Sequence, residues 1–350
     1  DKFTNRIFGL VSYYGDLYFP DMSNKPGFPK EHVTIIEKVP MSHLQFSRYT
    51  SARIVEIEET KRVFKGQKAR FSSAKSSSST YRVKSRQISN YCIPEYALGP
   101  VRGAKAREKF IDKITIEDLQ NVDEFSPKFA KIISNIAKHK NQLGMVYSQF
   151  VSGEGIGIFA KVLQALGWNY YQEPKTANDH DIKESKHKTF AILSGEIDAE
   201  IRLDIINKFN TNDGVIDLLL LSGAVAEGID LKRIRHVHIM EPFWNFARIN
   251  QVKTRAIRYR SHIDLPDHEQ NVQVYIYLSD YPVGYPSKKI TEPTTDVDLY
   301  TQSKSNMKLI DSFMLALAEA SIDCAVHYPN LDEAVRKRIN CKLCAPDNAR

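Results

Sequence analysis

A short, almost wholly apolar run at residues 215–221 is the feature that most constrains the fold of this 350-residue chain. Such a run, without alternating polar positions, is typical of a strand that is covered on both faces of a parallel sheet. Glu227, Gly228 and Asp230 come soon after it. Open α/β sheets hold their ligands just past the carboxyl ends of their strands. The sequence therefore predicts a ligand site at these three residues.

A second short strand is predicted at residues 235–240, and it leads into a helix predicted at residues 245–259. On that helix Gln251, Arg255 and Arg258 are four and three residues apart, so they share one face. Basic residues at helical spacing usually form a solvated surface, but the turn and strands before this helix favour a site. Arginine suits phosphoryl transfer, because its forked guanidinium neutralises charge on the phosphoryl oxygens.

The same alternation of strand and helix occurs on either side of this block. Residues 143–150 and 189–193 are short apolar runs, and each is followed by a turn and by apolar residues at helical spacing. A last strand is predicted at residues 272–278. This order predicts a twisted parallel sheet with helices on both faces. The glycine run at residues 153–157 lies between a strand and a helix, but its spacing does not match the dinucleotide-binding fingerprint.

Three segments of this α/β block resemble the motifs of superfamily 2 helicases. The Q-x-x-x-R-x-x-R pattern from Gln251 resembles motif VI, residues 222–231 resemble motif V, and residues 143–150 with the turn and helix after them resemble motif IV. The EPFWN sequence at residues 241–245 resembles the helicase-type subunit of the early transcription factor of poxviruses and asfarviruses. The viral nucleoside triphosphatases of transcription termination are similar too. Thr254 departs from the family, which usually has glycine before the first motif VI arginine.

The resemblance implies a RecA-like second helicase lobe, an α/β domain, followed by a mainly helical C-terminal appendage. The residues implied at the nucleotide are Arg255 and Arg258 on its phosphates, Gln251 for alignment, and Glu227, Gly228 and Asp230 at its edge. The residues implied at the nucleic-acid backbone are Ser148, Gln149, Ser194, Gly195, Ser222 and Gly223. Hydroxyls and backbone N–H groups suit such phosphate contacts.

The sequence contains no G-x-x-x-x-G-K-[ST] and no acidic DExH box after a strand. Without that cradle the chain has no primary site for a triphosphate. ATP and Mg²⁺ are therefore expected to be bound mainly by an N-terminal lobe, and these residues are expected to be the C-terminal half of a longer protein and inactive alone. The resemblance implies an ATP-dependent translocase of viral transcription. Its implied partners are nucleic acid, with DNA preferred, the N-terminal lobe, the viral RNA polymerase and a second transcription factor subunit.

The implied location is the cytoplasmic viral factory of the host and the virion. A second hypothesis keeps the fold but not the catalysis: a pseudo-helicase scaffold that binds DNA and recruits the viral RNA polymerase. Thr254 keeps this hypothesis open, because a β-branched residue costs helix propensity and crowds the backbone beside Arg255. DNA-stimulated ATPase activity separates the two hypotheses.

Positive charge is concentrated in one part of the chain. The net charge is +7, but residues 61–107 hold twelve basic residues and one acid, Glu95, so that segment carries +11 and the rest of the chain −4. Its serine-rich centre, residues 71–90, has too few apolar residues to fold alone. It is predicted to be a flexible basic arm that contacts nucleic acid, or else a solvated loop. The predicted domains are an entry segment at residues 1–60, this arm at 61–107, the RecA-like domain at 108–293 and a helical extension at 294–350.

Four cysteines in 350 residues favour a reducing compartment. Cys324 with His327 and Cys341 with Cys344 roughly satisfy the spacing of a zinc site. The alternative is that Cys324 is a small buried hydrophobe and the last pair belongs to a loose terminus, so no metal ligand is assigned. The sequence has no apolar run of about 18 residues, and no membrane role is predicted.

Two helix starts are marked by capping residues. Ser42 follows a strand predicted at residues 33–39, and Ser126 precedes Pro127. Serine caps a helix through its hydroxyl, and proline fits a first turn that needs no backbone N–H. In the second helix the apolar residues at helical spacing are assigned to packing: Phe129, Ile132, Ile133 and Ile136.

Overall fold

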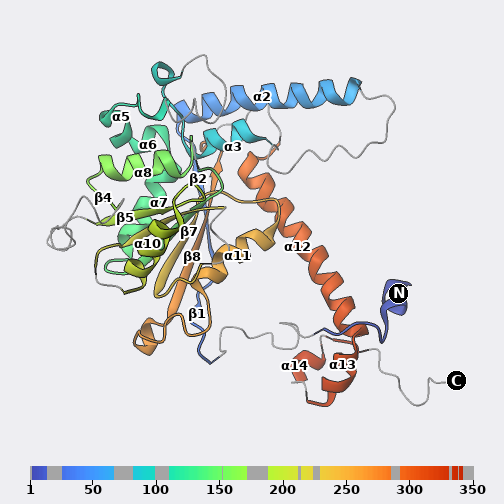
Figure 1. Ribbon diagram of the computed structural model, residues 1–350. Helices are drawn as coiled ribbons and strands as arrows, with labels where there is room; N and C mark the ends of the chain where they lie inside the picture. The colour runs from blue at the N-terminus through green and yellow to red at the C-terminus, as the bar shows by residue number, and fades with distance from the viewer. Residues whose placement is uncertain are drawn as a thin grey trace. The chain divides into compact units, whose positions relative to one another are not determined.

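The chain forms two compact units in a computed structural model (Figure 1). The larger unit is Gly27–Thr301, and the smaller combines Asp1–Pro26 with Gln302–Arg350. The residues that the structure describes are 2–13, 26–66, 82–98, 110–151, 153–171, 188–211, 214–223, 229–284, 292–330, 333–337 and 339–341. Much of the predicted basic arm, at 67–81 and 99–109, lies outside them.

An eight-stranded sheet forms the centre of the larger unit. Seven of its strands follow the order β1-β8-β7-β3-β6-β5-β4, and β2 also pairs with β8. The strands are β1 (Lys30–Glu31), β2 (Ile35–Pro40), β3 (Leu143–Ser148), β4 (Asn169–Tyr171), β5 (Thr189–Leu193), β6 (Leu218–Ser222), β7 (Ile234–Ile239) and β8 (Asn271–Asp280). Every strand pair among the described residues is parallel, which confirms the predicted sheet.

Helices cover both faces of this sheet (Figure 1). One core is made with α10 (Ala199–Thr211) and α11 (Phe246–Ala256), and the other with α7 (Pro127–Lys138) and α8 (Ile156–Ala165). In β6, Leu219 and Leu221 belong to the first core, whereas Leu218 and Leu220 belong to the second. Successive strand residues point to opposite faces. Since both faces are buried, β6 has no position at which a polar residue would meet water.

Side-chain caps fix where two helices begin, as predicted. The Ser126 hydroxyl accepts a hydrogen bond from the backbone N–H of Phe129 at 3.0 Å, at the start of α7. The Ser42 hydroxyl accepts one from the N–H of Gln45, also at 3.0 Å, before α2 (His43–Gly66). Each cap satisfies a backbone donor that has no partner within its helix.

Two parts of the larger unit come from outside the predicted RecA-like segment. β2, which was assigned to the entry segment, pairs with β8 from Ile35 to Pro40. Val83–Asn90, inside the predicted flexible arm, form the helix α3, and five of its eight residues are buried. Arg82 pairs with Asp298, and Arg86 is only 2% exposed. The prediction of flexibility is therefore wrong for this part, because tertiary burial overrides a polar local composition.

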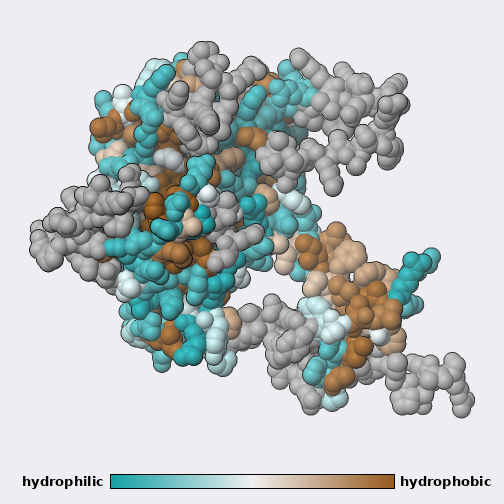
Figure 2. Space-filling model, in the orientation of Figure 1, coloured by the Kyte–Doolittle hydropathy of each residue, from teal (hydrophilic) through white to brown (hydrophobic). Residues whose placement is uncertain are grey.

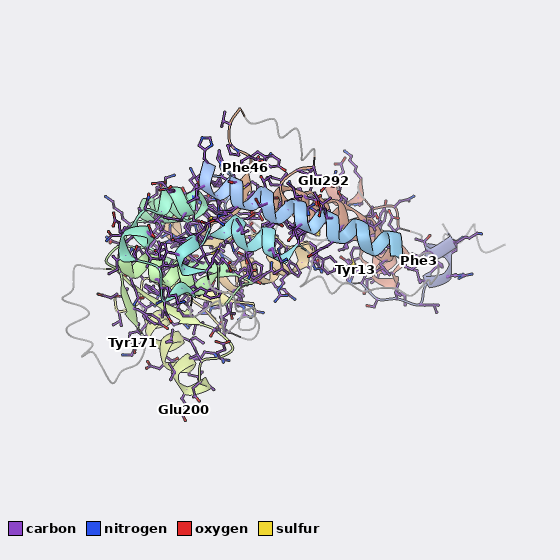
Figure 3. All side chains as sticks on the ribbon, turned by 90° about the horizontal axis from the view of Figure 1, so that it is seen from above. Phe3, Tyr13, Phe46, Tyr171, Glu200 and Glu292 are labelled. Atoms are coloured by element: carbon purple, nitrogen blue, oxygen red, sulfur yellow. A yellow bond between two sulfur atoms is a disulfide. The ribbon has the colours of Figure 1, made fainter. Side chains whose placement is uncertain are left out.

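A buried polar cluster ties α2 to the residues that follow β8. Arg53 is 3% exposed and forms ion pairs with Glu292 at 2.6 Å and with Glu56 at 3.4 Å. Figure 3 labels Glu292 beside α2. The Tyr49 hydroxyl and the Thr295 hydroxyl lie 3.0 Å apart at a fully buried position. These polar contacts hold the long helix α2 on the larger unit together with a small apolar cluster around Phe46 and Tyr49.

A second buried cluster joins α3, α7 and the start of α12 (Thr295–Ala320). Lys128 and Asp296 form an ion pair at 2.6 Å, and both side chains are fully buried. Lys128 also donates to the side-chain oxygen of Asn90 at 3.0 Å, and Asp296 accepts from the backbone N–H of Ser279 at 2.9 Å. The charges of Lys128 and Asp296 thus neutralise each other at a position that water does not reach.

Three histidines lie together where α7 ends beside the sheet. His236 and His238 of β7 join their ring nitrogens at 2.8 Å, and His139 stacks on His236 with ring centroids 4.5 Å apart. Burial lowers the pKa of His236 to about 3 and lowers the pKa of His238 well below its ordinary value. Gly144 of β3 makes room for the cluster, because a Cβ there would lie 2.0 Å from the His236 ring.

The smaller unit is mainly helical, as predicted for the C-terminal appendage. Its helical parts are α1 (Lys2–Ile7), α12 from Gln302, α13 (Ile322–His327) and α14 (Glu333–Arg336). Figure 2 shows hydrophobic residues gathered over α12 and α13. The exposed apolar side chains of α12 are Leu309, Ile310, Phe313 and Met314. No helix in the described parts of the chain is both long enough and apolar enough to span a bilayer.

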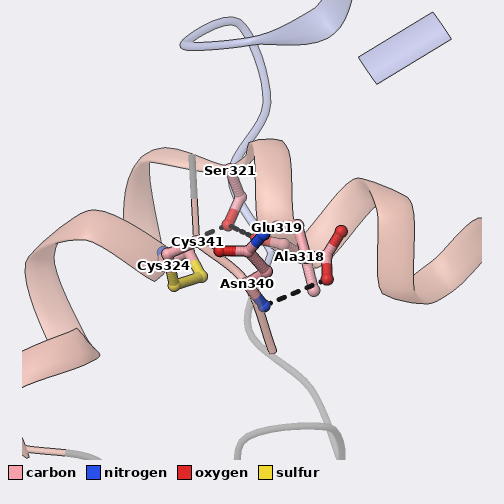
Figure 4. The surroundings of a disulfide bond; sticks show 6 residues. All are labelled: Ala318, Glu319, Ser321, Cys324, Asn340 and Cys341. Atoms are coloured by element: carbon pink, nitrogen blue, oxygen red, sulfur yellow. Dashed lines mark hydrogen bonds between the residues drawn. A yellow bond between two sulfur atoms is a disulfide. The ribbon is translucent and has the colours of Figure 1, made fainter. Parts of the chain in front are cut away.

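A disulfide between Cys324 and Cys341 closes the end of the smaller unit (Figure 4). The two Cα atoms are 5.6 Å apart. Ser321 caps α13 by accepting from the backbone N–H of Cys324 at 3.2 Å. Neither alternative of the sequence analysis predicted this pairing, although Cys324 is buried as one of them required. No metal-binding group of three His, Cys, Asp or Glu side chains occurs among the described residues, and Cys344 lies outside them.

The buried ion pair gives a prediction about stability. Asp296→Ala leaves the Lys128 ammonium buried without a counter-charge, and we expect the free energy of unfolding to fall by about 3–5 kcal/mol. Asp112→Ala is the matched control, because its ion pair with Lys161 is solvent-exposed and is worth about 0.5 kcal/mol. Urea denaturation measures both. If both substitutions lowered the free energy of unfolding equally, burial would not be what makes the Lys128–Asp296 pair important.

The histidine cluster gives a prediction about pH. A histidine whose folded pKa is lowered to about 3 stays neutral while the unfolded chain takes up a proton below about pH 6.5. The contribution of His236 is therefore complete above pH 6.5 and is lost as the pH falls towards 3, by about 2 kcal/mol at pH 5. His236→Gln should flatten the loss of unfolding free energy between pH 6.5 and 5. His268→Gln, at an exposed histidine, should leave that slope as it is.

The disulfide gives a prediction about covalent structure. Under denaturing, non-reducing conditions an alkylating reagent should label Cys92 but neither Cys324 nor Cys341, as peptide mass spectrometry would show. Reduction should destabilise the smaller unit by about 3 kcal/mol, because the bond closes a loop between residues 17 apart in sequence. Complete labelling of Cys324 in the unreduced protein would refute the pairing.

Candidate nucleotide and nucleic-acid site

Three of the predicted nucleic-acid residues follow neighbouring strands at one edge of the sheet. Ser148 ends β3 and Ser222 ends β6, and the two are partners in the parallel register. Ser194 directly follows β5, which is the next strand beyond β6. All three serines are buried. Because the strands are parallel, the structure brings these residues together at the carboxyl edge, with Gly195 and Gly223 in the turns that follow.

A buried glutamate holds the turn after β3 in place. Glu241 is 1% exposed and accepts hydrogen bonds from the Ser148 hydroxyl at 2.9 Å and from the backbone N–H of Gln149. Asn90 donates to its other oxygen at 3.2 Å. Burial raises the pKa of Glu241, although these hydrogen bonds and the charge of Lys128 oppose that shift. The sequence analysis gave Glu241 no role, and its place immediately after a strand was the only signal.

The predicted motif VI helix, α11, begins at this same edge. The Asn245 side chain caps it by accepting from the backbone N–H of Ala247 at 2.9 Å. The helix ends at Ala256, with Ile257 as its C-terminal cap, and not at residue 259. Arg258 therefore lies in the turn after the helix, so the prediction that it shares a helical face with Gln251 and Arg255 is wrong.

Arg258 pairs with the predicted nucleotide-edge residue Asp230. Its Nη1 donates to Asp230 Oδ1 at 2.9 Å and to the Ile229 carbonyl at 3.1 Å. The two side chains are 36% and 66% exposed, so the pair is open to solvent. The structure thus brings together two residues that the sequence analysis assigned to one site.

The position predicted for Asp230, just past the carboxyl end of β6, is wrong. Its carbonyl accepts from Asn210, near the end of α10, at 2.9 Å, and β7 begins only four residues later at Ile234. Because β6 and β7 are parallel, the connection between them must return to the amino edge before β7 can start. Glu227 and Gly228, the other residues predicted at this edge of the nucleotide, lie outside the described residues.

Gln251 and Arg255 lie on α11, where Gln251 is exposed and Arg255 is half-buried. Between them stands Thr254, the residue that departs from the family pattern. Its hydroxyl donates to the carbonyl of Gln251 at 2.9 Å. The helix continues to Ala256, so the threonine is accommodated without a break. Its exposed position avoids the crowding that a buried β-branched residue would cause.

The match to known families agrees with this geometry. Residues 127–260 match the family described as helicase conserved C-terminal domain. This segment is therefore similar to helicase C-terminal domains. The parallel sheet with helices on both faces has the RecA-like arrangement that the motifs predicted.

Viral proteins are similar along most of the chain. The termination factor NPH-I homolog of African swine fever virus (isolate Tick/Malawi/Lil 20-1/1983) is 30% identical over 393 residues, covering 100% of this chain and 52% of that protein. A putative ATP-dependent RNA helicase, R563, of Acanthamoeba polyphaga mimivirus is 33% identical over 288 residues, which cover 81% of this chain and 45% of that protein. The chain spans about half the length of the curated relatives it matches.

Among solved structures, the C-terminal part of the Fun30 ATPase domain superposes with a TM-score of 0.47 at 17% identity, covering 81% of this chain and 99% of that one. The relatives confirm the resemblance to helicases of large DNA viruses. The names of these relatives refer to a termination factor and to an RNA helicase.

Proposed function

We propose that this chain is the second lobe of an ATP-dependent nucleic-acid translocase that acts in viral transcription. The observation that carries the proposal is the placement of Arg258 inside a helicase C-terminal domain. It lies at the end of α11, half-exposed, and its only acidic partner among the described residues is the exposed Asp230. An arginine buried in an internal ion pair would have no access to a nucleotide.

Arg255 and Arg258 would act on the phosphates of ATP. Negative charge spreads over the equatorial oxygens of the phosphoryl group during its transfer, and guanidinium groups stabilise that charge. Asp230 keeps Arg258 extended at the surface until a nucleotide arrives. Exchange of one carboxylate for a phosphate then costs little, because the pair is solvent-exposed and weak. Gln251, exposed on the same helix, would align the nucleotide.

ATP itself would be bound mainly by another lobe. The sequence lacks the phosphate-binding loop, and no acidic cluster suited to Mg²⁺ occurs in the part of the chain that the structure describes. Mg²⁺, like ATP, is therefore assigned mainly to residues of that other lobe. The contribution of this chain is to supply arginines to a nucleotide held opposite them.

The carboxyl edge of the sheet would bind the nucleic-acid backbone. The residues proposed there are Ser148, Gln149, Ser194, Gly195, Ser222 and Gly223. Hydroxyls and backbone N–H groups suit phosphate oxygens, which carry no sequence information. The Ser148 hydroxyl and the Gln149 backbone N–H already donate to Glu241, so a phosphate at that turn would be met by the Gln149 side-chain amide. Glu241 supports this proposal by fixing the turn that presents Ser148 and Gln149.

The names of the relatives favour transcription termination over the early transcription factor role that the sequence motifs suggested. We therefore place the viral RNA polymerase among the proposed partners, with DNA as the nucleic acid and an N-terminal lobe as the other half of the ATPase. A second transcription factor subunit is a proposed partner only if the protein acts as an early transcription factor. The proposed location is the host cytoplasm and the virion.

The test uses the full-length protein with both lobes. Arg258→Ala should lower DNA-stimulated ATP turnover by about a hundredfold or more, the usual cost of removing an arginine finger. Arg260→Ala is the control, since Arg260 is exposed two residues away. Steady-state phosphate release measures both variants. Unchanged turnover in Arg258→Ala would sink the proposed catalytic role, and ATP turnover by the 350-residue chain alone would contradict its dependence on another lobe.

The second candidate is a scaffold that binds DNA and recruits the polymerase without useful catalysis. The two candidates differ in the same assay. A scaffold would show little DNA-stimulated turnover before any substitution, together with normal DNA binding.

A further inference from the structure

Arg248 lies on α11 three residues before Gln251, and it contacts the residues at the carboxyl edge of the sheet. Its Nε donates to the Tyr147 hydroxyl at 3.2 Å, and its guanidinium lies over the Phe243 ring, 5.1 Å from the centroid. Its Nη2 fills the space above Gly223, since a Cβ there would lie 2.6 Å from that nitrogen. Arg248 thus joins the ends of β3 and β6 while remaining half-exposed.

Buried hydrogen-bond donors without partners surround this position. In the described part of the chain, no partner is found for Ser222 Oγ, for Gln149 Nε2, or for Nε and Nη2 of Arg86. Arg86 is 2% exposed and lies over the Phe150 ring at 5.1 Å. A buried polar group without a partner costs about 1–3 kcal/mol, so such a cluster requires an explanation.

The carboxylate that accepts hydrogen bonds from this turn is already occupied. Glu241 accepts from Ser148, Gln149 and Asn90, so its lone pairs are largely satisfied. It neutralises Arg86 in part, while Arg248 adds a second positive charge beside Tyr147. The local excess is therefore of hydrogen-bond donors, and Arg248 is the half-exposed cation among them. A ligand that complements it is an anion with several acceptor oxygens.

We propose that Arg248 binds a backbone phosphate of DNA at the carboxyl edge, through the Nη groups that make no hydrogen bond to described residues. This inference rests on the proposed function and adds a charged residue to its nucleic-acid site. The phosphate is not that of the nucleotide. Arg248 and Arg258 lie at opposite ends of α11, and ten residues at 1.5 Å per residue separate them by roughly 15 Å.

The alternative is that Arg248 serves only to pack α11 against the sheet and binds no ligand. A guanidinium over Phe243 and a hydrogen bond to Tyr147 would stabilise the helix without any ligand. In that case a substitution at Arg248 would change the free energy of unfolding and leave the salt dependence of DNA binding unaltered. Salt dependence counts neutralised phosphates, so it separates the two roles.

The test measures binding of a fluorescent DNA, as a single strand and as a duplex, to the full 350-residue chain over a range of NaCl concentrations. Arg248→Gln should weaken binding about tenfold at low salt. The slope of log K against log salt should become shallower by about 0.7 for the single strand and about 0.9 for the duplex, one phosphate contact in each case. Lys232→Gln removes the same charge from an exposed residue beside Asn210, near the amino edge, and should change neither quantity.

Two further variants distinguish a lost phosphate contact from a folding defect in Arg248→Gln. Arg248→Lys keeps the charge but loses the forked geometry, so the slope should be preserved while the affinity falls. Gly223→Ala leaves Arg248 unchanged but displaces its Nη2, and it should also weaken binding. Wild-type affinity and slope in both Arg248→Gln and Gly223→Ala would overturn the inference while leaving the proposed function intact. Failure of the unchanged chain to bind DNA would overturn both.

Discussion

Parallel pairing of the strands is the constraint on which the rest of this structure depends. Each strand ends at the same edge, so every connection must cross a face of the sheet before the next strand begins. The helices that make these crossings bury both faces, which is why the strand residues of β6 are nearly all apolar. The same crossing runs from Glu241 at one edge, through α11, to the turn that holds Arg258 at the other. Two sets of functional residues, about 15 Å apart along one helix, follow from that single rule.

Buried polar groups at the carboxyl edge are linked in one chain of contacts. Lys128 is compensated by Asp296, and Asn90 links that pair to Glu241. Glu241 in turn holds Ser148 and Gln149. An unbalanced charge in this interior would cost several kcal/mol, so each group has to be positioned by its partner. The turn that faces the nucleic acid in our proposal is therefore tied to α3, α7 and α12, which lie outside the helicase motifs.

The sequence was sufficient for the elements whose burial is visible in local periodicity. β5 was predicted at its observed bounds, and the caps at Ser42 and Ser126 were correct. It failed where structure depends on distant partners. Val83–Asn90 have a polar composition, and only contacts with remote residues such as Asp298 and Glu56 make them a helix. The site followed the same division: spacing correctly placed Gln251 and Arg255 on one helix, whereas the end of that helix before Arg258, the support from Glu241 and the pairing of Arg258 with Asp230 required coordinates.

The geometry of α11 also suggests how the two proposed sites communicate. One helix joins Arg248, in its first turn, to the turn that carries Arg258, so a displacement at Arg248 would reach Arg258 if the helix moved as a rigid body. Release of Arg258 requires its carboxylate partner to be replaced, and the solvent-exposed pair with Asp230 provides only a weak restraint. Small shifts of the helix can therefore change which anion Arg258 meets. A buried, strong ion pair at this position would have blocked such an exchange, and the exposure of both side chains is what permits it.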